Sequence, residues 1–520
     1  ALMHASQPNK KQQFRSMAYT GDQVHYRIRA SRFGAHLSYL VKQWPADRVF
    51  MGFGMYESFA GQAGLEKFKK DLKSYVQLIK FRHPNGNYVL ISPIAVEDGH
   101  DQYQANRAQR NSDLALYTKA MQEIATSEKI GFVNLFDTST ALYKSNKESL
   151  TDDGTQLNSL GNALIAQALA SELSGRDKVS AIKADSDGFI GLKKLVQRKA
   201  QEVAQCYHPA NGISYYGVRA RSYEYKPAIP HLLKIANQLD QNIWQQSGKL
   251  NSALNFPKLP VLHAQMPSKP PKAGLGIIKT SAEDLKDFTV ADGFEVKCFA
   301  SSEDFPELIN PLQIRFDAKG RLWVTCFASY PHPLPGDVAN DKILIFEDTD
   351  GDGKADKKTV FAEGLMLPDG FVFYKEGIIA SVSRKLIYLA DTDGDDTADV
   401  RTELLRGIDD TDTHHSGYLS RTPQGDVMVS EALFHRGQLE TPQGVVHTKD
   451  VSIMRFNPEN KQLTVERQTQ APNPWKISFD RWGESIQFYG GGQIIDADLH
   501  NIWTPMGHLA PTALGMPFRY

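Results

Sequence analysis

The chain has 520 residues, a formal net charge of −1 at pH 7 and 41% hydrophobic residues. A chain of this length is expected to form about two to four domains. Because basic residues are not in excess, the composition argues against nucleic acid or an anionic membrane surface as a partner. No run of about 18 apolar residues occurs, so we expect no transmembrane segment.

Residues 1–175 alternate predicted strands and helices. Apolar runs predict buried strands at 49–54, 88–93 and 132–136. Helical spacing of apolar residues predicts helices from 64, from 113 and over 159–173. The last helix is expected to bury Leu160, Leu164, Ala168 and Leu169. Such alternation predicts a parallel sheet covered by helices on both faces, a three-layer αβα domain.

Three segments of this domain, 14–22, 52–59 and 153–158, resemble the sequence blocks of SGNH (GDSL-like) hydrolases. The resemblance implies a Ser nucleophile in the first block, a Gly and an Asn as oxyanion donors, and a late Asp-x-x-His. Here Asp153 is present and Gly21 is a possible donor, but Gln156 stands where the His belongs and Tyr56 where the Asn belongs. Because Gln cannot act as a general base near neutral pH, we expect this domain to be catalytically inactive.

Residues 176–280 form a predicted helical connector. Apolar spacing predicts helices at 191–204 and 230–246, and a Pro- and Lys-rich stretch at 256–274 predicts a semi-extended linker. We place a domain boundary near residue 280. His208 lies in a turn-rich segment between the helices, where packing between domains explains it better than a site does.

Residues 281–520 show an all-β pattern. Short strands are predicted at 294–299, 312–316, 321–326, 342–346 and 359–361. Two acidic segments, 348–356 and 391–399, begin 43 positions apart and each follows an apolar strand. Recurrence at this interval predicts the blades of a β-propeller. From about residue 285 there is room for roughly five blades, so a six-bladed ring would be incomplete in this chain.

The acidic segments predict calcium loops, because carboxylates at alternate positions can converge on one hard cation. The first loop offers Asp348, Asp350, Asp352 and Asp356. The second offers Asp391, Asp393, Asp395 and Asp399. Gly353 marks the bend of the first loop, and Asp396 replaces it in the second at a cost in backbone freedom. The alternative is a pair of solvated acidic turns.

Four segments of this half, 340–353, 412–416, 434–442 and 473–475, resemble the propeller of the membrane-bound dehydrogenase family of Planctomycetes and Verrucomicrobia. That family often places an SGNH-like domain first and is related to quinoprotein sugar dehydrogenases. The resemblance implies oxidation of a sugar or alcohol, with electrons leaving through a PQQ-like quinone or a haem. It also implies export to the periplasm or cell surface, which the calcium loops favour. No signal peptide is visible in this chain.

A cytochrome c domain or partner chain is a further implication of the resemblance. No Cys-x-x-Cys-His occurs here, so a haem would lie on a missing segment or on a partner that completes the propeller. The second hypothesis is a non-catalytic structural or binding subunit of a larger extracytoplasmic complex. The degenerate hydrolase motifs favour that hypothesis.

A dehydrogenase of this kind needs a general base beside the substrate carbon and cations to hold an anionic quinone. His414 or His415 is the predicted base, with Asp412 to orient it. The predicted cofactor or substrate contacts are His435, Arg436 and Arg481. The alternative is structural: adjacent His residues point to opposite faces of a strand, and a His-Arg pair can cap a blade loop.

Overall fold

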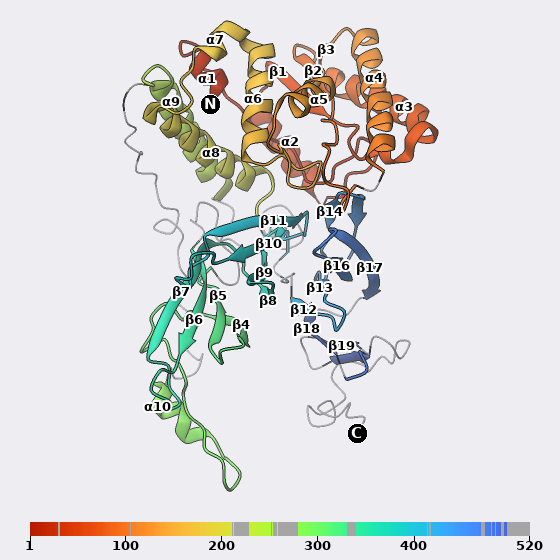
Figure 1. The fold of residues 1–520 in the computed structure, drawn as a ribbon. Coiled ribbons are helices and arrows are strands. Elements are labelled where there is room, and N and C mark those ends of the chain that lie inside the picture. The colour runs from red at the N-terminus through yellow and green to blue at the C-terminus, as the bar shows by residue number, and fades with distance from the viewer. Residues whose placement is uncertain are drawn as a thin grey trace.

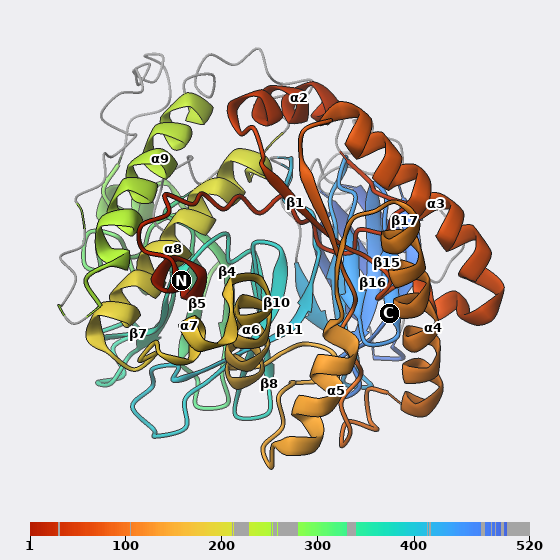
Figure 2. The ribbon, with the colours of Figure 1, turned by 90° about the horizontal axis from the view of Figure 1, so that it is seen from above.

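The computed structural model describes most of the chain. The described residues are 1–29, 32–104, 106–210, 212, 228–250, 252, 257, 279–329, 340–412, 414, 418–469, 474–479, 481–483, 485–489 and 493–496. A helical half built from the N-terminal residues lies against one end of a β half (Figure 1). Seen from above, α3 and α4 lie on one side of the helical half, and α8 and α9 lie on the other (Figure 2). Among the described residues, no helix is long and apolar enough to cross a membrane.

The N-terminal domain contains the predicted parallel sheet. Its strands are β1 (Arg48–Gly52), β2 (Asn87–Ile91) and β3 (Gly131–Val133), in the order β1-β2-β3. Adjacent residues of β2 pack on opposite faces of the sheet. Leu90 packs with α3 (Gly61–Arg82) and α4 (Arg107–Ser127), whereas Ile91 packs with α6 (Ser159–Ser174). Helices therefore cover both faces of the sheet, as the αβα prediction requires.

Two local predictions in this domain were wrong. The strand predicted to reach residue 136 ends at Val133, because Asn134 accepts a hydrogen bond from the Asp137 amide and starts α5 (Leu135–Ser145). Helix α6 turns Gly161 and Ile165 inward and leaves Leu160 39% exposed, whereas Leu169 packs against the core as predicted. A Cβ on Gly161 would lie 2.0 Å from the Leu150 carbonyl oxygen, so this close approach sets the rotation of the helix.

The sequence pattern did not reveal four helices of the N-terminal half, α1 (Leu2–Ser6), α2 (Phe33–Gln43), α5 and α7 (Arg176–Ser180), or the short 3-10 helix η1 (Glu57–Ala60). The connector forms the two predicted helices, α8 (Asp187–Tyr207) and α9 (Ala228–Ser247), which pack together through Leu192, Leu195, Leu239 and Ile243. The predicted linker at 256–274 lies outside the described residues, apart from Pro257.

The C-terminal half consists of antiparallel sheets preceded by α10 (Ser281–Asp284) and η4 (Leu285–Asp287). The first sheet contains β4 (Pro311–Phe316), β5 (Leu322–Cys326), β6 (Asp341–Glu347) and β7 (Lys357–Leu365). The second contains β8 (Gly370–Tyr374), β9 (Gly377–Val382), β10 (Lys385–Ala390) and β11 (Val400–Arg406), extended by β14 (Gln438–Thr441) and β15 (Gly444–His447). The third sheet contains β12 (Leu419–Arg421), β13 (Val427–Ser430), β16 (Val451–Asn457) and β17 (Gln462–Thr469). The fourth sheet contains β18 (Pro474–Phe479), β19 (Ser485–Tyr489) and β20 (Gln493–Asp496).

The first strands of the four sheets lie next to one another. Arg315 of β4 donates to the carbonyl oxygens of Phe371 in β8 (2.8 Å) and Leu419 in β12 (2.8 Å). Ser420 of β12 in turn donates to the carbonyl oxygen of Ile477 in β18. Among the described strands, no backbone pairing joins one of these sheets to another and no closed ring is formed. The complete propeller therefore stays a prediction.

The strand predicted at 294–299 is absent, and this prediction was wrong. The segment is described without a strand, and Phe294 is 76% exposed. Its apolar residues alternate as strand residues do, but among the described residues no neighbouring strand pairs with it. Alternation alone does not make a strand when hydrogen-bonding partners are missing.

Candidate functional site

The predicted base and its orienting carboxylate come together in the loop after β11. Asp412 is 6% exposed, and its Oδ1 accepts a hydrogen bond from the His414 amide (3.0 Å). The same oxygen is hydrogen-bonded to Nδ1 of the His414 ring. With the proton on Nδ1, the basic electron pair lies on Nε2, the arrangement of a carboxylate-oriented general base. His415 lies outside the described residues.

Phe434 supports the His414 ring from the neighbouring segment. The two rings meet edge to face, with centroids 5.6 Å apart. Phe434 has a φ of 71°, a conformation that a bulky residue rarely adopts. Such strain persists where the surrounding structure holds it, often beside functional groups.

Arg436 connects this loop to a cleft. Its amide donates to Asp409 Oδ2 (2.7 Å). The cleft has a volume of about 390 Å³ and is lined by Tyr26, Ile28, Arg436, His447, Thr448, Lys449 and Gln468. It therefore lies between the N-terminal domain and the adjoining parts of the second and third sheets, with two cationic residues in its lining.

The other two predicted contact residues lie elsewhere. His435 is buried, with 1% exposure, and does not line the cleft. Arg481 lies in the turn between β18 and β19, with its guanidinium 4.0 Å from the centre of the Trp482 ring. Figure 1 shows β18 and β19 farther from the N-terminal domain than β14. Of the three predicted contacts, only Arg436 faces the cleft.

Glu431 is a buried acid that the sequence analysis missed. Its Oε1 accepts from the Asp409 amide (3.2 Å), and its Oε2 is hydrogen-bonded to the Thr448 hydroxyl. Burial raises the pKa of Glu431 to about 8, and the negative charge of Asp409 adds to the rise. In the sequence, Glu431 is a single acidic residue one position after the apolar run 427–429 and Ser430, a pattern that strand prediction alone does not single out.

Each acidic loop brings three of its four predicted ligands together. Oxygens of Asp348, Asp350 and Asp356 lie within 4.8 Å of one another, as do those of Asp391, Asp393 and Asp399. The fourth carboxylates, Asp352 and Asp395, instead accept hydrogen bonds from the amides of Lys354 (2.7 Å) and Thr397 (2.7 Å). The negative charge of Asp395 raises the pKa of Asp393, so the second loop concentrates like charges.

The bends of the two loops use the same backbone conformation. Gly353 has a φ of 89° and Asp396 has a φ of 64°, so the second loop places a non-glycine residue in the left-handed region. The Asp396 carboxylate pairs with Arg321 at 2.9 Å, a contact that glycine could not make. This ion pair ties the second loop to the first sheet.

The hydrolase-like positions of the N-terminal domain lie at the junction with the β domain. The Gly21 amide donates to Glu440 Oε1 (2.8 Å), and the Tyr56 hydroxyl is hydrogen-bonded to the same carboxylate. Asp153 Oδ2 pairs with Lys461 Nζ at 2.8 Å. Gln156 donates to Glu403 Oε1 (3.3 Å). These side chains therefore hold the two halves of the molecule together.

Comparisons with known proteins give one family match. Residues 280–491 match a model described as a domain of unknown function, DUF7133. The comparison with curated proteins found no match.

Parts of the chain are similar to solved structures. A lipase/acylhydrolase from Enterococcus faecalis is 20% identical, with a TM-score of 0.22, over 30% of this chain and 72% of that chain. A catalytic mutant of an acetylxylan esterase from Geobacillus stearothermophilus is 16% identical, with a TM-score of 0.23, over 30% of this chain and 68% of that chain. A luciferin-regenerating enzyme is 12% identical, with a TM-score of 0.25, over 36% of this chain and 55% of that chain.

Proposed function

We propose that this chain is an extracytoplasmic, calcium-binding propeller protein that oxidises a sugar or alcohol. The hydrogen-bonded pair of Asp412 and His414 carries the proposal. In this reaction His414 Nε2 accepts the proton of the substrate hydroxyl. The buried Asp412 carboxylate holds the ring in place and stabilises the imidazolium that forms.

The cleft beside Arg436 fits a small anionic quinone. Its volume of about 390 Å³ lies within the range of small-molecule sites, about 300–1,000 Å³. Arg436 and Lys449 supply positive charge, and Thr448 offers a hydroxyl. A PQQ-like quinone bound there would take up the electrons removed from the substrate. A haem would belong to a cytochrome c domain or chain, because this sequence has no haem-attachment motif.

An assay with an artificial electron acceptor tests the proposal. The purified chain, supplied with calcium and PQQ, should reduce a redox dye when sugars or alcohols are added. Titration of PQQ should show saturable binding that high salt weakens, because the cleft is cationic. Dye reduction that is independent of substrate, together with no PQQ binding, would refute the proposal.

We also propose that both acidic loops bind calcium. The three convergent carboxylates of each loop and the sharp bend beside them support this assignment. A cation would neutralise the like charges of the second loop, where the charge of Asp395 raises the pKa of Asp393.

Calcium removal is expected to lower the unfolding temperature. Calcium at a hundred times its dissociation constant would stabilise the fold by about 2.7 kcal/mol per site, and a chelator removes that contribution. Differential scanning calorimetry with calcium or with chelator measures the shift. Asp350→Asn should reduce this temperature shift more than Asp352→Asn, because only Asp350 belongs to the group of three convergent carboxylates. Asp352→Asn is the matched control, because each of the two side chains accepts one amide hydrogen bond. An unchanged unfolding temperature would refute calcium binding and would support the alternative that the two segments are solvated acidic turns.

A non-catalytic structural or binding subunit is the second candidate function. It is favoured by the junction contacts of Gly21, Tyr56, Asp153 and Gln156 with the β domain. We propose that the N-terminal domain is a degenerate SGNH-like hydrolase that serves as a platform for the β half. A chain that binds neither quinone nor substrate would support this role.

A further inference from the structure

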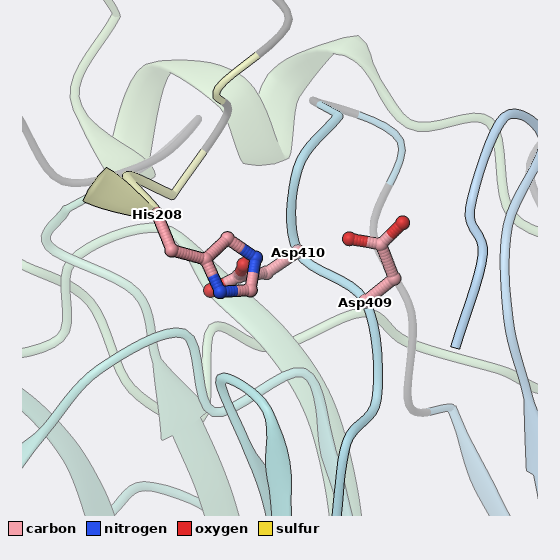
Figure 3. Close-up of side chains that lie close together, drawn as sticks. All are labelled: His208, Asp409 and Asp410. Atoms are coloured by element: carbon pink, nitrogen blue, oxygen red, sulfur yellow. The ribbon is translucent and has the colours of Figure 1, made fainter. Parts of the chain in front are cut away.

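A histidine and two aspartates from distant parts of the sequence meet beside the domain junction. His208 follows α8 at the end of the connector helix, whereas Asp409 and Asp410 lie in the loop after β11. One ring nitrogen of His208 and one oxygen of each aspartate lie within 4.8 Å of one another. Figure 3 shows the imidazole beside the two carboxylates. Neither acidic calcium loop contributes to this cluster.

The contacts of the two aspartates leave electron pairs for a ligand. Asp409 accepts from the amides of Thr411 (2.9 Å) and Arg436 (2.7 Å), one on each oxygen. Asp410 accepts from Ser383 Oγ (2.9 Å) and Arg384 Nε (2.6 Å), again one on each oxygen. Since a carboxylate oxygen has two lone pairs, each oxygen retains one.

A tyrosine of the N-terminal half holds the imidazole, and an arginine of the β half holds the His208 backbone. His208 Nε2 is hydrogen-bonded to the Tyr19 hydroxyl, and the two rings stack with centroids 3.8 Å apart. Arg384 Nη2 donates to the His208 carbonyl oxygen (2.6 Å). Figure 3 shows Nε2 on the side of Asp409, so a bound cation would replace the Tyr19 hydroxyl at this nitrogen. The Arg384 hydrogen bond to the His208 carbonyl and the stacked Tyr19 ring would keep the imidazole in place.

The charge of the cluster favours a cation. Asp409 and Asp410 are 7% and 9% exposed, and among the described residues Arg384 is the one cation that forms an ion pair with either of them. One buried negative charge is left without an ion-pair partner, which is costly unless a cation compensates it.

We propose that His208, Asp409 and Asp410 bind a divalent transition-metal ion, for which zinc is the best match. One imidazole and two carboxylates are a ligand set that zinc accepts, and three protein ligands leave a position for water or a further ligand. The ion would join the connector helix to the β domain. This assignment is independent of the dehydrogenase proposal, because the cluster shares no residue with the Asp412–His414 pair.

Metal titration tests this site. The chelator-treated chain, kept in excess calcium to fill the acidic loops, is titrated with Zn²⁺ against a chromogenic chelator. We expect one tight equivalent in the wild type and a loss of affinity of at least about 10- to 100-fold in His208→Gln and Asp409→Asn. His83→Gln is the matched control, because its ring is outside the cluster, and it should keep the site. Equal zinc binding by all four proteins would overturn the proposal.

A second measurement separates ligation from folding. Co²⁺ should replace zinc and give a visible ligand-field spectrum in the wild type and His83→Gln. Asp409→Asn keeps the side-chain shape and one oxygen acceptor, so its far-ultraviolet circular dichroism should match the wild type while the cobalt spectrum weakens. An unchanged cobalt spectrum in His208→Gln would overturn the site even if that variant were less stable.

Discussion

Lys461→Met is expected to lower the free energy of unfolding by about 3–5 kcal/mol, because it leaves a buried carboxylate at the domain junction without its cation. The Lys461 and Asp153 side chains are 4% and 5% exposed, and Nζ lies 2.8 Å from Oδ2. Methionine has nearly the same length, and Lys461 already has a φ of 55°, so the substitution changes the charge more than the backbone strain. Urea unfolding followed by circular dichroism measures the loss.

The pH dependence of this loss follows from Asp153. Burial alone would raise the pKa of Asp153, but the Lys461 charge and nearby hydrogen bonds hold it below its usual value. The wild type therefore has this stabilisation above the unfolded-state pKa and loses it as the pH falls through the folded-state pKa. In Lys461→Met the unpaired carboxylate has a raised pKa instead. The difference between the two proteins should shrink toward acidic pH.

Two further variants separate the effect of breaking this buried ion pair from the effect of removing a lysine charge elsewhere. Lys375→Met removes an exposed pair with Glu459, whose side chains are 52% and 64% exposed, and should cost no more than about 1 kcal/mol. Asp153→Asn in the Lys461→Met background should recover part of the stability, because a neutral amide is less costly to bury than a carboxylate. Equal losses for Lys461→Met and Lys375→Met would show that the junction does not depend on this pair.

Much of the fold could be predicted because its signals are local. The three parallel strands lie in apolar runs, and α3, α8 and α9 carry apolar stripes at helical spacing. The rotation of α6 could not be predicted, because it depends on the contact of Gly161 with Leu150. The strand predicted at 294–299 does not form. Its residues alternate as strand residues do, but no described strand pairs with it.

The candidate sites also divide into those formed by residues close in the sequence, which could be predicted, and those formed by distant residues, which could not. Asp412 and His414 are two residues apart, so a single turn brings them together and the sequence sufficed. The Asp153–Lys461 pair spans 308 positions, and His208 meets Asp409 only after the connector folds onto the β domain. Pairs formed across a domain junction leave no periodic signal in one sequence. Sequence analysis therefore found the local dyad and the acidic loops and assigned His208 to packing between domains, but it missed the partners of His208 and the Asp153–Lys461 pair at the junction.

His414→Gln is expected to lower kcat for substrate-dependent dye reduction by about 10²- to 10⁴-fold, the range that a positioned general base contributes. Glutamine keeps a hydrogen-bonding side chain of similar size but cannot accept the proton. Because the change removes an interaction of the transition state, KM and PQQ affinity should stay close to the wild-type values. Steady-state kinetics and a PQQ titration on the same preparations measure both quantities.

Two further variants test the role of His414 as the base. Asp412→Asn should also lower kcat, since Asp412 orients the base and stabilises the imidazolium rather than accepting the substrate proton. His83→Gln should behave as the wild type. A His414→Gln protein with full kcat would show that another residue is the base, and His415→Gln would then be the variant to measure.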